Sequence, residues 1–254
     1  MSAARRGTYL ATRHSAFLAV ALLLTMNAFG QPVRTFNPEN PMVRMDGVAL
    51  FLCAIVLIGA MLTVLASSKY LEHVHSNWGE FYTLVLSSVT GMMFLAAASD
   101  LLMLFLSLEL MSIPVYALAG FRRASLRSNE SAVKYFLIGS FASGLLLYGS
   151  SLLYGATGSL VLTEIATSFD PENALDLCGA GLVAGRARFK ISSVPFHQWA
   201  PDAYEGAPTT VSRLHGDDRE GRRVRRARAR GLGRARARRG RARARALAAR
   251  GAHA

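Results

Sequence analysis

The sequence predicts an all-α fold, a polytopic bundle of transmembrane helices, and two observations favour it. Apolar residues make up 52% of the chain, and the mean hydropathy is +0.27, which is high for a water-soluble domain. The uncharged runs are also 19 to 29 residues long. About 20 apolar residues in a helix cross a hydrocarbon core of ~30 Å, so each run is long enough for one membrane span.

The uncharged runs define most of the expected spans. Val48–Ala66 and Phe81–Ser99 each contain 19 residues without a charge, and Tyr135–Thr163 contains 29. Phe81–Phe121 is too long for one helix, so we expect it to break next to Asp100. The expected spans lie at about 15–30, 47–66, 81–99, 101–121, 133–153 and 176–198.

The first segment has two interpretations. Arg5, Arg6 and Arg13 precede the apolar run Phe17–Met26, and small residues around Gly30 resemble a cleavage site, as in a signal peptide. We favour a retained membrane helix, because further spans follow at once.

Loop charges predict the orientation of the bundle. Three arginines crowd the short loop 122–127, and such loops stay on the cytoplasmic side. Alternation then places 154–175 outside, and this segment contains three acidic residues and no lysine or arginine.

Three ionisable residues lie within or at the edge of the expected spans: Glu109, Lys134 and Lys190. A charge at the centre of a membrane helix costs about 2.5–3.5 kcal/mol on insertion scales, so such residues usually have a function, most often in ion or proton transfer. Burial favours the neutral form of both an acid and an amine, so a neighbouring charge can load or release a proton. Lysine suits this role better than arginine, which keeps its proton.

Prolines follow Lys190 and predict a broken helix between Lys190 and Pro195. Pro195 has no N–H to donate to the carbonyl of Ile191, so the helical hydrogen bonds are interrupted there. Broken helices at membrane depth commonly mark ion sites. The sequence contains no phosphate-binding glycine loop, paired catalytic carboxylates, nucleophile triad or metal-ligand cluster, so we expect no metal site.

Three strings carry a resemblance to a known family: residues 79–123, 132–160 and 189–212. They resemble, in this order, the subunit N family of bacterial NADH–quinone oxidoreductase (respiratory complex I), whose members are antiporter-like membrane subunits. The resemblance implies an inverted-repeat helical fold with a broken helix. It matches Glu109 to the family's fifth-helix glutamate, Lys134 to the sixth-helix lysine and Lys190 to the lysine of the broken helix.

The resemblance also implies a function. Members translocate protons, driven by quinone reduction elsewhere in the complex, and bind no cofactor themselves; NADH and quinone are used by the whole complex. The expected partners are other membrane subunits and the lipid bilayer, in the inner membrane of a bacterium. The alternatives are a subunit of a cation/proton antiporter or of a membrane-bound hydrogenase complex, to which the family is similar.

The chain departs from the family in two places. Arg186 and Arg188 stand where an apolar helix is expected, and the likeness stops after Ser212. Residues 213–254 contain 16 arginines and three acidic residues, which accounts for the whole net charge of +13. We interpret this Arg/Ala-rich segment as an out-of-frame, disordered tail rather than a nucleic-acid-binding arm, so a nonfunctional truncated fragment is a further alternative to a transport subunit within 1–212.

Overall fold

The computed structural model describes residues 3–37, 41–74, 78–194, 197 and 199–200 of the 254-residue chain. These residues belong to one unit, which spans residues 1–215. The Arg/Ala-rich segment 213–254 lies outside the described residues, so the expectation of a disordered tail is not addressed.

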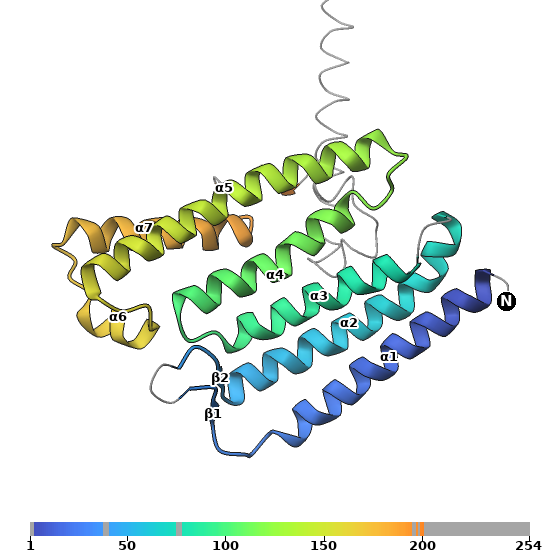
Figure 1. Ribbon diagram of the computed structural model, residues 1–254, viewed down its shortest axis with the longest axis horizontal. Coiled ribbons are helices and arrows are strands. Elements are labelled where there is room, and N and C mark those ends of the chain that lie inside the picture. Colours follow the sequence, from blue (N-terminus) through green and yellow to red (C-terminus); the bar gives the residue numbers. More distant parts are fainter. Residues whose placement is uncertain (1–2, 38–40, 75–77, 195–196, 198, 201–254) are drawn as a thin grey trace, which may run out of the picture. The chain divides into compact units, whose positions relative to one another are not determined.

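Long α-helices account for most of the described residues, and consecutive long helices lie side by side (Figure 1). Helix α2 packs between α1 and α3, α4 packs between α3 and α5, and α7 packs against α5. The helices are α1 (Ala3–Asn27), α2 (Gly47–Val74), α3 (Trp78–Ala97), α4 (Leu101–Ala119), α5 (Leu126–Thr157), α6 (Leu162–Ser168) and α7 (Ala174–Lys190). The strands are β1 (Arg34–Thr35) and β2 (Arg44–Met45), which pair antiparallel.

Among the described residues, five helices are long and apolar enough to cross a membrane, namely α1 to α5. The predicted all-α transmembrane bundle is therefore confirmed. Large apolar side chains cover much of its outer surface, for example Leu23 and Phe141, each with 68% of its surface exposed. Such a surface is suited to lipid rather than water.

Backbone hydrogen bonds join the connecting segments at one end of the bundle. Ser99 N donates to Met42 O at 3.0 Å, and Leu162 N donates to Ser99 O at 3.1 Å. At the other end, Arg123 Nη2 lies 3.2 Å from Glu80 Oε2. The segments around β2 and α6 thus share one end, and the arginine-rich loop lies at the other, which is the grouping that the orientation argument requires.

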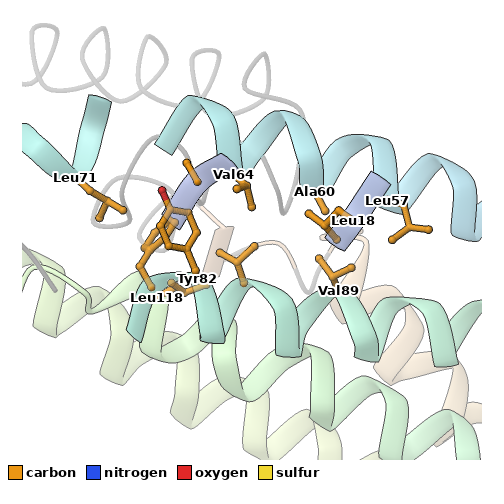
Figure 2. Close-up of a cluster of buried hydrophobic side chains, with 11 residues drawn as sticks. Leu18, Leu57, Ala60, Val64, Leu71, Tyr82, Val89 and Leu118 are labelled. Carbon is orange, nitrogen blue, oxygen red and sulfur yellow. The ribbon is translucent and has the colours of Figure 1, made fainter. Parts of the chain in front are cut away.

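Helices α1, α2 and α3 share an apolar core (Figure 2). Leu57 and Val64 of α2 and Tyr82 of α3 are fully buried, and Leu18 of α1 packs into the same cluster. Helices α3 and α4 pack still more closely, because a Cβ atom at Gly91 would overlap the backbone of Met111. In lipid, where apolar residues gain little from leaving the solvent, such close backbone approach is the main source of helix association.

Helix α5 uses its small residues for packing on one face only. Gly139, Ser143 and Gly149 are buried, whereas Ser140 and Gly144 are exposed. A Cβ atom at Gly149 would lie 2.8 Å from the carbonyl oxygen of Gly179, so α5 and α7 meet with their backbones nearly in contact. The expectation that α5 is packed inside the bundle thus holds for the face towards α4 and α7.

The structure interrupts the last expected span, 176–198, after Lys190. Helix α7 ends at Lys190, and Ile191 and Ser192 leave the helical path, with Ser192 at a φ of 53°. Helix α7 has 17 residues and three basic side chains in its last turns, Arg186, Arg188 and Lys190, and it is not among the five candidate membrane helices. The predicted break after Lys190 is present, while Pro195 itself lies outside the described residues.

Candidate functional site

Glu109 lies in the middle of α4, with roughly 12 to 15 Å of helix on each side at 1.5 Å per residue. At this distance from both ends of the helix, the carboxylate cannot reach the water there. Its side chain is 23% exposed. Ser143 of α5 donates its hydroxyl hydrogen to Glu109 Oε1. The carboxylate is therefore held at the interface between α4 and α5.

Helix α7 contributes an arginine to the same carboxylate. Nη2 of Arg186 lies 3.9 Å from Glu109 Oε1, and the Arg186 side chain is only 2% exposed. The guanidinium also lies over the ring of Phe189, with Cζ 5.4 Å from the ring centroid. A buried ion pair thus connects the middle of α4 to the last turns of α7.

Lys190 lies one turn after Arg186 and contacts a different group on α4. Its Nζ donates to the hydroxyl of Ser112 at 3.4 Å, and Ser112 is fully buried. Both Glu109 and Arg186 are close enough to act on the charge of Lys190. The structure thus brings Glu109 and Lys190, two of the three ionisable residues that the sequence singles out, into one polar group.

Helical spacing explains how these contacts align. Glu109 and Ser112 are three residues apart on α4, and Arg186 and Lys190 are four apart on α7, so each pair lies on one face of its helix. The polar group therefore includes two contacts between α4 and α7, which lie one helical turn apart, together with the bond from Ser143 of α5. We call Glu109, Ser112, Ser143, Arg186 and Lys190 the central polar group.

Aromatic side chains cover the central polar group on the side of the arginine-rich loop. Tyr116 lies one turn beyond Ser112 and packs edge-on against Tyr135, with ring centroids 4.7 Å apart. Tyr135 stacks on Trp199 at 4.5 Å, and Trp199 Nε1 donates to Phe189 O at 3.1 Å. The chain after the break thus folds back over Phe189 and separates the polar group from that end of the bundle.

Lys134 does not lie in the central polar group. Its side chain is 48% exposed, and its Nζ lies 2.5 Å from Oε1 of Glu130 on the same helix. Lys134 precedes Ser143 by nine residues, which is two and a half helical turns, so the two side chains point to opposite faces of α5.

Sequence reasoning missed three members of the central polar group. Ser112 and Ser143 had no distinguishing signal, because serines are common on the small-residue faces of membrane helices. Arg186 did have a signal, a charge within an otherwise apolar stretch, but it was interpreted as a departure from the family pattern. Among the described residues, no group of three or more His, Cys, Asp or Glu side chains is placed to hold a metal ion.

A protein-family model matches residues 98–215 of the chain. The matching family is described as NADH:quinone oxidoreductase/Mrp antiporter, transmembrane. The match includes α4, α5 and α7 and therefore every member of the central polar group.

Curated relatives are similar over most of the chain. NADH-quinone oxidoreductase subunit N 1 of Sorangium cellulosum is 49% identical over 184 residues, which are 70% of this chain and 36% of that protein. NADH-quinone oxidoreductase subunit N of Alkalilimnicola ehrlichii is 42% identical over 212 residues, which are 82% of this chain and 43% of that protein. The chain thus spans about two fifths of the length of these relatives.

Solved structures show the same helical arrangement. A chain of respiratory complex I from Thermus thermophilus matches with a TM-score of 0.69 at 36% identity, over 82% of this chain and 44% of that one. A chain of the Mrp complex from Dietzia matches with a TM-score of 0.68 at 20% identity, over 82% and 41%. The second likeness shows the fold alone.

Proposed function

This chain belongs to the antiporter-like membrane-subunit family of NADH–quinone oxidoreductase, and we propose that it acts in proton translocation within such a complex. The observation that carries the proposal is the central polar group. An acid and an amine lie within one buried group in a bundle of helices that can cross a membrane. Ionisable groups at this depth are energetically costly, and those that are present usually mark ion or proton pathways.

The proposed route of the proton uses the members of this group in turn. Lys190 takes up and releases the proton, because its charge depends on its neighbours Glu109 and Arg186. Hydroxyls can both donate and accept hydrogen bonds, so Ser112 can exchange a proton with the amine of Lys190, and Ser143 can exchange one with the carboxylate of Glu109. Lys134 joins the route on the outer face of α5, at the end of the bundle that carries the arginine-rich loop.

The rest of the proposal concerns the complex. We propose that the chain binds no cofactor and has no redox site of its own, and that other subunits carry out the reaction between NADH and quinone. Its partners would be further membrane subunits in the inner membrane of a bacterium. The arrangement supports this, because long helices with apolar outer surfaces leave ample area for lipid and for neighbouring subunits.

Inverted membrane vesicles from cells that carry the chain in its complex test the proposal. NADH oxidation is followed by absorbance, and proton uptake is followed with a pH-sensitive dye in the same vesicles. Glu109→Gln and Lys190→Ala should each lower proton uptake per NADH oxidised towards the level of vesicles that lack the chain. Lys134→Ala tests the outer amine in the same way.

The matched control is Glu172→Gln, which removes an exposed carboxylate from the loop before α7 and should leave proton uptake unchanged. Immunoblots of the vesicles show whether each variant reaches the membrane in normal amount. Normal proton uptake in both Glu109→Gln and Lys190→Ala would contradict the proposed route.

A further inference from the structure

Arg186 is the largest fully buried side chain in the described part of the chain, with 1% of its surface exposed. Its Nε, Nη1 and Nη2 atoms make no hydrogen bond of standard geometry within the described residues. Arginine holds its proton at every accessible pH, so it cannot relieve the cost of burial by becoming neutral. It therefore needs an anionic partner close by.

Glu109 is the anionic partner of Arg186. Its Oε1 lies 3.9 Å from Arg186 Nη2, and the two side chains come from different helices. Asp176, the acidic residue of α7 itself, lies ten residues before Arg186, about 15 Å along the helix. Within the described residues, the ion pair with Glu109 is thus the one that offsets the buried guanidinium.

The groups that face this ion pair carry an excess of positive charge. Lys190 faces it from α7, Tyr116 from α4 and Ser143 from α5, whereas Arg188 is exposed. Two cationic side chains therefore share one carboxylate. Because the arginine charge is permanent, Arg186 attracts the Glu109 carboxylate whether or not Lys190 carries a proton.

The register of the contacts separates Lys190 from the ion pair. Arg186 lies opposite Glu109, and Lys190 lies one turn on, where it donates to Ser112 at 3.4 Å. Ser112 is neutral, so Lys190 has no ionic partner of its own in this contact. The proton that can leave the group with least cost is the one on Lys190.

We propose that Arg186 is a positioning residue that pairs with the Glu109 carboxylate across the contact between α4 and α7 and so leaves Lys190 available for the proton exchange proposed above. The role of this exchange in transport rests on the proposed function. The pairing of Arg186 with Glu109 is a property of the chain itself and can be measured without transport.

Infrared spectroscopy of the purified full-length chain in lipid bilayers tests the pairing. A protonated carboxylic acid gives a carbonyl band that a carboxylate lacks, and a band that disappears in Glu109→Gln belongs to Glu109. At neutral pH the natural chain should lack this band. Arg186→Gln should gain it, and Arg186→Lys, which keeps a positive charge, should show little of it.

Arg188→Gln is the matched control, because it removes an exposed arginine two residues further along the same helix. It should leave the spectrum unchanged. If Arg186→Gln gains no band that Glu109→Gln removes, or if Arg188→Gln gains the same band, the proposal is wrong. These readings do not depend on proton pumping, so they distinguish a failure of the pairing from a failure of the proposed function.

A double variant covers the case in which Arg186→Gln does not fold. Removing both partners should restore the stability that is lost when only one is removed, because neither charge is then left buried without its partner. Arg186→Gln/Glu109→Gln should therefore accumulate in the membrane in larger amount and unfold at a higher temperature than either single variant. A double variant that is worse than both would overturn the proposal.

Discussion

The Ser143 hydroxyl ties the Glu109 carboxylate to α5, so it links two helices through one hydrogen bond. Ser143→Ala removes this donor and leaves one carboxylate oxygen with a poorer set of partners. Hydrogen bonds to charged groups contribute about 1.5–3 kcal/mol. We expect the variant to lose stability of this order, measured as the free energy of unfolding in mixed detergent micelles.

The matched control is Ser140→Ala, which changes an exposed serine one turn earlier on the same helix. Its free energy of unfolding should stay within the error of the natural chain. Equal losses in the two variants would mean that the effect comes from helix α5 in general and that the bond to Glu109 adds no stability.

Which residues could be predicted depends on how each one differs from its surroundings. Glu109 is a single charge in the apolar run Leu101–Phe121, and Lys190 precedes a helix break, so both stood out in the sequence. Arg186 stood out as well, but a charge pattern does not reveal which helix faces it. Its pairing with Glu109 depends on how α7 is rotated against α4, and this rotation is set by packing that one sequence does not reveal.

Helices α5 and α7 approach closely at Gly149 and Gly179, and this contact positions Arg186 and Lys190. Gly149→Leu would force atoms into the backbone of α7, and overpacking of this kind costs typically about 1–3 kcal/mol. We expect a lower midpoint of thermal unfolding, followed by circular dichroism of the helices.

Gly144→Leu provides the comparison on the same helix, because nothing lies within 4 Å of a Cβ atom there. Leucine favours helix over glycine by roughly 0.5–1 kcal/mol, so this variant should be as stable as the natural chain or more so. A fall in the midpoint for Gly144→Leu as large as that for Gly149→Leu would show that α5 packs differently.

The extents of the helices were less predictable than their presence. Helix α5 begins at Leu126, seven residues before the expected span, because its first turns contain charged and polar residues. Ser125 caps this end through a bond from Ser128 N to Ser125 Oγ at 3.4 Å, and Glu130 pairs with Lys134. A search for uncharged runs leaves such turns out because they contain charged residues. Local contacts, rather than lipid, stabilise them.

The two ends of the bundle should face opposite sides of the membrane. In a background with Cys53→Ser and Cys178→Ser, the variants Ala124→Cys and Glu172→Cys place one thiol at each end, in exposed positions. The arginine-rich loop stays inside under the charge rule. A membrane-impermeant maleimide should therefore label Glu172→Cys in intact spheroplasts and Ala124→Cys only in inverted vesicles.

The opposite labelling pattern would reverse the orientation of the bundle, and labelling of both thiols in spheroplasts would mean that the bundle does not span the membrane as predicted. Detergent-solubilised samples show that both thiols can react. The fold class was predictable because hydropathy along the sequence identifies the segments that are apolar enough to span a membrane as helices.

The contact between Gly91 and Met111 leaves no room for α3 and α4 to slide past each other. Helices α3 and α4 therefore keep their positions relative to each other, and Glu109 lies on α4 two residues before this contact. Helix α7, by comparison, ends in a bend after Lys190 and packs along α5, with its closest backbone approach at Gly179 against Gly149 of α5. A displacement that carries Lys190 between successive partners would then arise at the bend that follows it, while the carboxylate remains in place.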